Sequence, residues 1–343
     1  MRKYNVAILG ATGAVGQELL QLIGERKFPY NELKLLASSR SARKQIEFAG
    51  RTYTVEEATP DSFKDVHIAL FAGGAASKEF APAAVRHGAV VIDNSSTFRM
   101  DPEVPLVVPE VNAEALKNHK GIIANPNCST IIMVMALKPL YDKVKIKRVV
   151  VSTYQAVSGA GKEAIDELTD QVKAYFENRP ITAQILPSAS LPKHYQIAFN
   201  LIPQIDVFME DGYTKEELKM VYETQKILND YNIRVTATTV RVPVYRSHSE
   251  SINIEFEDHM PVDEAKRLLS QFPGVIVQDD PAEMVYPMPL FTSGRDEIFV
   301  GRIREDKTVP HGLNLWVVGD QIRKGAALNA LQIAEYMIKE NLI

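Results

Sequence analysis

Apolar runs that alternate with amphipathic stretches dominate the first 127 residues of the chain. Runs typical of buried strands occupy residues 4–9, 33–37, 66–71, 89–93 and 121–124. Helical spacing of apolar residues appears at 17–23 and at 75–87, where Pro82 predicts a break or kink. Strands that alternate with helices form parallel sheets with helices on both faces. This region therefore predicts an α/β fold with a doubly wound parallel sheet.

A different pattern follows residue 127. A buried helix is expected at 131–138, a long strand at 147–155, a charged helix at 163–177, and an irregular arm at 180–203, interpreted as a subunit contact. Thr214 and Glu217 fit a capping box for a helix that ends near residue 229. Further strands are expected at 234–243, 252–257, 274–277, 298–304 and 313–318, the last with Trp316 in the core.

The antiparallel-looking alternation of these later strands predicts an α+β second domain. The final Ala-rich helix is expected to return and cover the first domain. We therefore predict one domain of residues 1–127 plus 322–343, and a second domain of residues 128–321.

Composition narrows the possible partners and location. Thirty-nine basic and 43 acidic residues give a net charge of −4, which argues against nucleic acid or an anionic membrane as the main partner. No apolar run reaches transmembrane length, and the N-terminus opens into a strand without the apolar region of a signal peptide. Cys128 is the single cysteine, which excludes an internal disulfide. Together these features predict a cytoplasmic protein.

Gly10, Gly13 and Gly16 lie between the first strand and the first helix. Glycines here allow a tight turn, and a dinucleotide pyrophosphate binds at the helix N-terminus. The G-x-x-G-x-x-G spacing departs from the commoner G-x-G-x-x-G. Its place at the first strand–helix junction nevertheless indicates a Rossmann-like nucleotide site.

The second strand ends in a segment that includes Ser38, Arg40 and Ser41, where an acidic residue would bind a ribose 2′-hydroxyl. Hydroxyls and a guanidinium suit a 2′-phosphate instead, which favours NADP over NAD. A solvated basic loop is the alternative, because two more basic residues follow.

Cys128 is expected in the first turn of the buried helix, because Pro126 ends the strand before it and Asn127 is a good helix cap. Unpaired amide groups and the helix dipole stabilise a thiolate there, and the thiolate is the nucleophilic form. A small buried thiol in a strand-to-helix turn is the alternative. The position at the helix start favours the nucleophile.

Polar residues that could serve this nucleophile occur at strand ends and on one helix. Arg99 could bind an anionic group and Gln155 a carbonyl or carboxylate; a surface ion pair and an ordinary polar strand end are the alternatives. Glu216 and Lys219 lie one turn apart on one helix face, and the capping role of Glu217 leaves them available for a site.

Arg241 and His248 flank Pro243 and are seven residues apart. In an unbroken strand they would face opposite sides of the sheet. Pro243 and the polar residues after it predict a break, which would allow both side chains to converge. No histidine or carboxylate has the spacing of a metal motif, so no metal is expected.

These motifs, taken together, resemble one enzyme family over nearly the whole chain. The segments that carry the resemblance are Gly10–Gly16, Asn125–Ser129, Tyr154–Gly159, Arg241–Val244, Ser247–Ser249 and Gly319–Ala326. In residues and spacing they resemble aspartate-semialdehyde dehydrogenase. The Asn-Pro-Asn-Cys context separates the chain from N-acetyl-glutamyl-phosphate reductases and glyceraldehyde-phosphate dehydrogenases.

The resemblance implies an NADP-dependent homodimer that converts L-4-aspartyl phosphate to L-aspartate 4-semialdehyde, for lysine, methionine, threonine and isoleucine biosynthesis. It implies Cys128 as the acyl-enzyme nucleophile, Gln155 as the orienting residue and His248 as the acid/base. For the substrate it implies Arg241 at the carboxylate, Glu216 at the amino group, and Arg99 and Lys219 at phosphate. With the two nucleotide segments above, the expected NADP contacts are Gly10, Thr12, Gly13, Ala14, Val15, Gly16, Ser38, Arg40, Ser41, Ser158, Gly159 and Gln321, the last of which is often Asn in the family.

Other classes of protein share parts of this pattern. A cofactor-free cysteine hydrolase would use Cys128 and His248 but leaves the glycine turn unexplained. A non-catalytic nucleotide sensor would explain the glycines but not the polar residues around Cys128. Another phosphorylating semialdehyde dehydrogenase, such as an N-acetyl-glutamyl-phosphate reductase, is the alternative enzyme.

Overall fold

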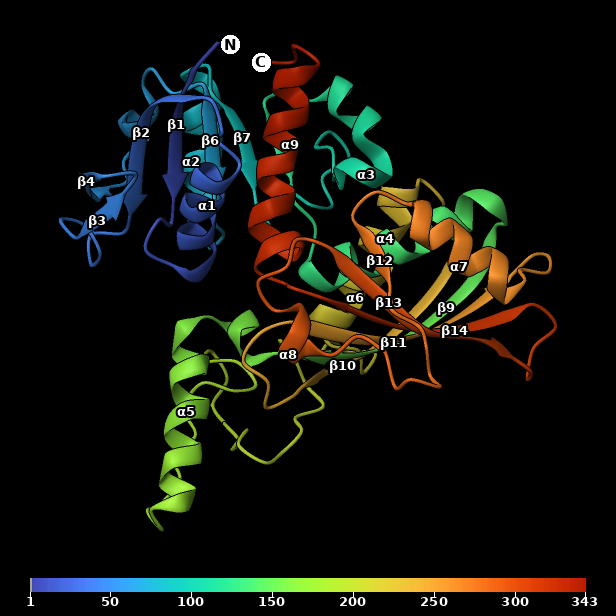
Figure 1. The fold of residues 1–343 in the computed structure, drawn as a ribbon. Helices are drawn as coiled ribbons and strands as arrows, with labels where there is room; N and C mark the ends of the chain where they lie inside the picture. The colour runs from blue at the N-terminus through green and yellow to red at the C-terminus, as the bar shows by residue number, and fades with distance from the viewer. Residues whose placement is uncertain (1) are drawn as a thin grey trace. The chain divides into compact units, whose positions relative to one another are not determined.

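The computed structural model describes residues 2–343, which divide into two compact units (Figure 1). Among these residues, unit 1 consists of 2–127 and Gly325–Ile343, and unit 2 consists of Cys128–Lys324. Each unit is built around its own six-stranded sheet.

The sheet of unit 1 is parallel throughout, with strand order β5-β2-β1-β6-β7-β8. Its strands are β1 (Tyr4–Leu9), β2 (Tyr30–Ala37), β5 (Glu56–Glu57), β6 (Ile68–Phe71), β7 (Val90–Asp93) and β8 (Ile122–Ala124). The order runs outward from β1 in both directions, which confirms the predicted doubly wound sheet. A hairpin of β3 (Gln45–Phe48) and β4 (Arg51–Thr54) follows β2 and was not predicted.

Helices cover both faces of this sheet (Figure 1). On one face, α1 (Ala14–Glu25) and the C-terminal α9 (Leu328–Lys339) share a core with alternate strand residues. The predicted return of the last helix to the first sheet is therefore correct. On the other face, α2 (Ser77–Arg86) and the 3-10 helix η1 (Pro60–Phe63) pack together.

The predicted break at Pro82 does not occur, because α2 continues through this residue. Phe80, Ala81 and Ala84 of α2 are packed into the core on that face of the sheet. This packing offsets the one helical hydrogen bond that a proline removes. The remaining short helices of unit 1 are α3 (Pro109–Asn112) and η2 (Ala113–Asn118).

The sheet of unit 2 is mixed, with strand order β10-β9-β11-β14-β13-β12. Its strands are β9 (Ile146–Gln155), β10 (Arg234–Arg241), β11 (His248–Phe256), β12 (Val275–Val277), β13 (Ile298–Asp306) and β14 (Gly312–Gly319). The β10–β9 and β12–β13 pairs are parallel and the others antiparallel. The antiparallel expectation is thus right for the centre of the sheet and wrong at both edges, where long connections permit parallel neighbours.

One face of this sheet is covered by α4 (Cys128–Lys143), α6 (Lys215–Leu228) and α7 (Val262–Gln271). Side chains on the other face, such as Tyr154 and Trp316, are only partly buried. The prediction that Trp316 belongs to the core is therefore wrong. Its indole N–H donates to the carbonyl oxygen of Pro287 at 2.9 Å, just before the short helix α8 (Pro289–Thr292).

The arm after α5 (Lys162–Phe176) contains no helix or strand over residues 177–213, as expected for 180–203. Gln171 anchors it from α5: its side-chain oxygen accepts from the N–H groups of Ile197 and Ala198 at 2.9 and 3.0 Å. A pair of backbone hydrogen bonds between Ile202 and Arg241, of 3.0 and 2.8 Å, joins the arm to the end of β10. Its role as a subunit contact stays a prediction.

The predicted capping box begins α6. The Thr214 N–H donates to Glu217 Oε2 at 2.7 Å, and the Glu217 N–H donates to Thr214 Oγ1 at 3.3 Å. Glu217 Oε1 also accepts from the Thr239 N–H at 2.9 Å, which ties the helix to β10. Separately, among the helices of residues 2–343 none is long and apolar enough to cross a membrane.

Gly16 allows α1 to pack closely against the glycine turn, and this gives the first prediction. A Cβ at Gly16 would lie 2.2 Å from the Gly10 oxygen, whereas a Cβ at Gly13 would lie 3.5 Å from the same atom. Gly16→Ala should therefore cost about 1–3 kcal/mol of stability through overpacking and weaken nucleotide binding. Thermal unfolding and a fluorescence titration with NADP measure both effects. Gly13→Ala is the matched control, and equal losses in the two variants would contradict the argument.

Candidate active site

Three strands of unit 2 bring Gln155, Arg241 and His248 into one row. Arg241 of β10 pairs with Gln155 of β9, and Ser249 of β11 pairs with Tyr154 of β9, which places His248 beside Gln155. Directly paired residues point to the same face of a sheet. The three side chains therefore share the buried face.

The chain break that this arrangement needs lies at Pro243. β10 ends at Arg241, β11 begins at His248, and the two strands flank β9 on opposite sides. The two side chains converge: a Cβ at Gly159 would lie 2.9 Å from Arg241 Nη1 and 3.3 Å from His248 Nε2. β11 starts four residues earlier than predicted, and the first three residues of this extension, His248, Ser249 and Glu250, are buried.

The peptide groups of Ala156 hold both side chains. Its N–H donates to His248 Nδ1 at 3.0 Å, and its carbonyl oxygen accepts from Arg241 Nη1 at 2.7 Å. Ala156 is fully buried, so water does not compete for these bonds. Sequence reasoning missed this residue because a backbone contact leaves no side-chain signal.

Cys128 is the first residue of α4, as the position of Asn127 predicted. It interacts electrostatically with Arg241, which links the thiol to the row. Burial lowers the pKa of the Arg241 guanidinium, and the charges of Glu216 and Cys128 oppose that effect. A helix start beside a buried cation is an environment in which a thiolate forms readily.

Glu216 and Lys219 extend the site from α6. Gln155 Nε2 lies 3.4 Å from Glu216 Oε1 and 3.3 Å from Thr153 Oγ1. Lys219 Nζ lies 3.0 Å from both Glu216 Oε2 and Asp206 Oδ2. Burial lowers the pKa of Lys219, but these two carboxylates outweigh burial and raise it above its ordinary value. Lys219 therefore remains an ammonium, and its role toward phosphate stays a prediction.

Gln321 and Ser158, both expected near the nicotinamide, contact each other. Gln321 Nε2 donates to the Ser158 hydroxyl, and Gln321 Oε1 accepts from the Ser247 N–H at 2.9 Å. Gln321 thereby fixes the residue immediately before His248. Its contact with NADP, like those of Ser158 and Gly159, stays a prediction.

The other expected nucleotide residues lie in unit 1. Gly10 has φ 85°, and Gly13 precedes α1 without a side-chain cap, so amide groups at the helix start are not bonded by a capping side chain. Thr12, Ala14 and Val15 lie in this turn or in the first turn of α1. A tight turn with a 2.9 Å bond from the Ser41 N–H to the Ser38 oxygen follows β2 and exposes Arg40.

Arg99 also belongs to unit 1. The alternative of a surface ion pair is wrong, because the side chain is only 8% exposed. Its Nε donates to the Asn125 carbonyl oxygen at 2.9 Å, and its Nη2 donates to that of Asn94 at 2.8 Å. Arg99 therefore connects the ends of β7 and β8, where ligands of parallel sheets bind.

Glu250 is a buried acid that sequence reasoning missed. It lies one row below His248, paired with Thr153 and Val317, and is 0% exposed. Neither carboxyl oxygen has a hydrogen-bond partner within residues 2–343. Burial raises the pKa of Glu250 well above its ordinary value, which favours the uncharged, protonated carboxyl group. A polar residue in a Ser-rich segment gave no signal for burial.

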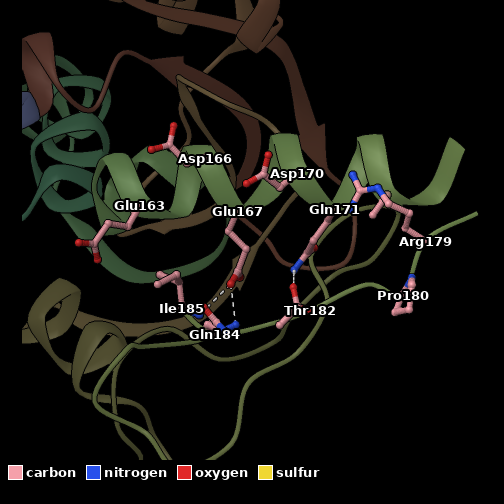
Figure 2. Close-up of a pocket in the computed structure, with 11 residues that line it drawn as sticks. Glu163, Asp166, Glu167, Asp170, Gln171, Arg179, Pro180, Thr182, Gln184 and Ile185 are labelled. Carbon is pink, nitrogen blue, oxygen red and sulfur yellow. Dashed lines mark hydrogen bonds between the residues drawn. The ribbon is translucent and has the colours of Figure 1, made fainter. Parts of the chain in front are cut away.

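A separate cavity of about 600 Å³ lies between α5 and the start of the arm. Figure 2 shows its acidic side chains along α5 and the Glu167 carboxylate bonded to the N–H groups of Gln184 and Ile185, at 2.6 and 3.0 Å. Its lining residues include no cysteine or histidine, so it lacks the chemistry of the row. Within residues 2–343, this cavity included, no group of three or more His, Cys, Asp or Glu side chains is placed to hold a metal ion.

The comparisons with known proteins agree with this geometry. Residues 5–119 match the model described as semialdehyde dehydrogenase, NAD binding domain, and residues 137–324 match semialdehyde dehydrogenase, dimerisation domain. Fold and site thus define a semialdehyde dehydrogenase. The aspartate-semialdehyde dehydrogenase of Aquifex aeolicus is 59% identical, with 99% of both chains covered. The chain belongs to the aspartate-semialdehyde dehydrogenase family.

Solved structures support the same conclusion. Aspartate semialdehyde dehydrogenase II from Vibrio cholerae, complexed with ASA, superposes with a TM-score of 0.93 at 48% identity, covering 99% of each chain. The enzyme from Candida albicans, solved with NADP, has a TM-score of 0.75 at 25% identity, covering 100% of each chain. The family predicted from the sequence motifs is confirmed, and the N-acetyl-glutamyl-phosphate reductase alternative is not favoured.

Gly159 keeps Arg241 and His248 in place, because any side chain there would contact both. Gly159→Ala should displace the guanidinium and lower kcat/KM by about 10²-fold, the cost of a misplacement near 1 Å. Steady-state kinetics test this, with thermal unfolding to show that the fold persists. Ala160→Gly, in the same exposed turn, is the control. Unchanged kinetics in Gly159→Ala would show that the row tolerates the methyl group.

Glu250 predicts an unusual pH dependence of stability. The pKa of Glu250 is higher in the folded protein than in the unfolded chain. Its contribution to folding stability is therefore fully present below the pKa of the unfolded chain, and it is lost as pH rises through the pKa of the folded protein. Between these two pKa values, the free energy of unfolding falls by about 1.4 kcal/mol per pH unit. Glu250→Gln should therefore unfold at a higher temperature than the parent at pH 8, with a gap that narrows toward pH 5. Glu255→Gln, on the other face of the same strand, should show no such trend, and a constant gap for Glu250→Gln would refute the assignment.

Proposed function

We propose that this protein catalyses the NADP-dependent interconversion of L-4-aspartyl phosphate and L-aspartate 4-semialdehyde plus phosphate, in lysine, methionine, threonine and isoleucine biosynthesis. The observation that carries the proposal is the row of Arg241, Gln155 and His248, together with the electrostatic interaction between Cys128 and Arg241. A thiol nucleophile that interacts electrostatically with a buried guanidinium, which itself lies near an imidazole, suits acyl transfer on an anionic substrate.

Cys128 supplies the covalent step. Its sulfur attacks the acyl carbon of the aspartyl phosphate, a C–S bond forms, and phosphate leaves with the electron pair of the broken C–O bond. NADPH, when bound, supplies the hydride that reduces the resulting thioester. The C–S bond then breaks as the aldehyde carbonyl forms, and Cys128 regains its thiolate.

Arg241 and Glu216 recognise the amino-acid end of the substrate in this proposal. Arg241 Nε has no hydrogen-bond partner within residues 2–343, and a guanidinium binds a carboxylate through paired N–H groups. Glu216, 5% exposed, supplies a carboxylate for the α-ammonium group. An N-acetylated substrate lacks that cation, which favours aspartyl phosphate over N-acetyl-glutamyl phosphate. Arg99 and Lys219 are the proposed phosphate contacts.

Unit 1 supplies the NADP site. Gly16 fits this role because a Cβ would overlap the turn, and the start of α1 has no capping side chain. The pyrophosphate is then bound by amide groups of the turn, including those of Thr12, Gly13, Ala14 and Val15. Ser38, Arg40 and Ser41 bind the 2′-phosphate.

The proposed setting is a cytoplasmic homodimer. A catalytic thiol without a second cysteine persists best in a reducing compartment, which supports the cytoplasm. The match of residues 137–324 to a dimerisation-domain model supports the homodimer.

Cys128→Ser tests the covalent step. A serine hydroxyl stays protonated at neutral pH, so turnover of aspartate semialdehyde with phosphate and NADP should fall by at least about 10⁴-fold. NADPH absorbance measures turnover, and NADP affinity should be unchanged because the cofactor residues are intact. Iodoacetamide should alkylate the parent at Cys128 more slowly when substrate is present. Substantial activity in the serine variant would exclude a thioester.

A further inference from the structure

Ser247, the residue immediately before His248, has a backbone conformation that is unusual for a buried residue. Its φ is 71°, in the left-handed region that residues other than glycine seldom adopt. Of the non-glycine residues with positive φ within 2–343, Ser247 alone is buried, at 0% exposure, and all the others are exposed or half-buried. Strained backbone that its surroundings hold in place clusters at functional sites. Ser247 is therefore a candidate for a role at the active site.

The turn at Ser247 determines how the chain enters β11. β10 ends at Arg241 on one side of β9, and the connection leads to the other side of β9, where His248 begins β11 opposite Gly319 of β14. β11 must begin with its first side chain on the buried face, because a shift by one residue would turn every side chain of the strand to the other face. The backbone dihedral angles of Ser247 set the direction of that first residue.

Two polar side chains from different segments hold Ser247 in this conformation. The Gln321 side-chain oxygen accepts the Ser247 N–H at 2.9 Å. The hydroxyl of Thr292, the last residue of α8, is hydrogen-bonded to the Ser247 hydroxyl at 2.9 Å. Thr292 and Gln321 are both buried, so water does not compete for either bond. Contacts from outside β11 thus fix the conformation of Ser247.

The residue before Ser247 is held by the same two segments. The Arg246 guanidinium pairs with the Asp320 carboxylate, and the Arg246 carbonyl oxygen accepts from the Ser293 hydroxyl at 3.2 Å. Asp320 Oδ2 also accepts the Gly294 N–H at 2.6 Å, which joins the chain after α8 to the chain after β14. Arg246 and Ser247 are therefore bonded to both segments just before β11 begins.

The imidazole of His248 needs such support because only one of its ring nitrogens is bonded. Nδ1 accepts the Ala156 N–H at 3.0 Å, whereas Nε2 has no hydrogen-bond partner within residues 2–343. A single hydrogen bond fixes one distance but still allows the ring to tilt, unless the Cα that carries the ring is fixed as well. Groups of a catalytic site must be held within about 0.5 Å of their productive geometry.

We propose that Ser247 is a positioning residue for the proposed reaction: its left-handed turn, held by Gln321 and Thr292, fixes the start of β11 so that the His248 imidazole is correctly placed. Ser247 does not touch the substrate in this proposal and acts only through His248. The inference rests on the proposed function, with the acid/base role that the family resemblance implies for His248. A misplacement near 1 Å costs about 10²-fold in rate.

The first test reports the placement of His248 without turnover. Gln155-Ala156 is the single Gln-Ala pair in the sequence, so protein labelled with ¹³C-carbonyl glutamine and ¹⁵N-alanine gives one HNCO signal. That signal belongs to the Ala156 N–H, which donates to His248 Nδ1. We expect it to shift in Thr292→Val, which removes the hydroxyl but keeps the branched shape, and to return toward the parent position in Thr292→Ser. An unmoved signal in Thr292→Val overturns the proposal.

The second test separates positioning from substrate binding by kinetics. Thr292→Val and Ser247→Ala should each lower kcat about 10- to 10²-fold, and the double variant should lose little more, because both substitutions break the same bond. KM for aspartate semialdehyde should change by no more than about twofold, because Arg241 and Glu216 are unaltered. Thr292→Ser keeps the hydroxyl and should restore most of the rate. Thermal unfolding shows that each variant is folded.

Two kinetic results overturn the proposal. One is a pair of losses that multiply in the double variant, which would mean that Thr292 and Ser247 act independently. The other is a rise in KM without a fall in kcat. If one of the single variants fails to fold, the other decides through its kcat, its KM and its Ala156 signal.

The failure of this inference is distinguishable from the failure of the proposed function. If the parent does not turn over aspartate semialdehyde with phosphate and NADP, the function is wrong, and the Ala156 signal still tests whether Thr292 and Ser247 place His248. If the parent is active and Thr292→Val keeps the signal and the rate of the parent, the function stands and the positioning role is wrong.

Discussion

The backbone of Ala156 is the contact on which the site depends. One peptide segment orients the imidazole of His248 through its N–H and the guanidinium of Arg241 through its carbonyl oxygen. The same segment is joined to the strand connection opposite it, where the Val242 N–H donates to Gln155 at 3.0 Å and the Val157 N–H donates to Val244 at 2.8 Å. Backbone hydrogen bonds thus hold the side chains of Arg241 and His248 in place. These hydrogen bonds do not depend on the rotamers of neighbouring side chains.

Burying the polar groups of the active site lowers the stability of the fold. The guanidinium of Arg241, the imidazole of His248 and the carboxyl group of Glu250 are each costly to bury, and burial shifts the pKa of each toward the uncharged form. Hydrophobic packing of α4 and of the row beneath the site compensates: Ile131 to Leu137 are almost wholly inaccessible to solvent, as are Val151 and Ile252. Such arrangements are typical of active sites, where groups unsuited to a core are retained for function.

The sequence was sufficient to predict which residue types matter and which elements carry them. The glycine turn, the helix start at Cys128, the capping box of Thr214 and the break near Pro243 are local features, with signals in a few adjacent residues. How these features come together in space, in contrast, is not determined by adjacent residues. Arg241 lies beside His248 only because β10 and β11 flank β9, an order that no short segment specifies. The burial of Glu250 was not predicted, and the core position predicted for Trp316 was wrong, for the same reason: what covers each face of a sheet decides burial. Ala156 acts through its backbone N–H and carbonyl groups, and the identity of its side chain does not indicate this role.

The C-terminal helix bears on how the chain is made. Residues of α9 complete the core that β1, β2 and α1 begin, although more than 300 residues separate α1 from α9 along the chain. A ribosome releases the chain from its N-terminus, so the first 127 residues emerge early, yet their core lacks the contribution of α9 until that helix has been made. Unit 2 contains all of its own strands before Lys324 and is complete first. Order of synthesis and order of folding are therefore opposed: unit 1 begins first, but part of its apolar sheet surface stays uncovered until α9 has left the exit tunnel.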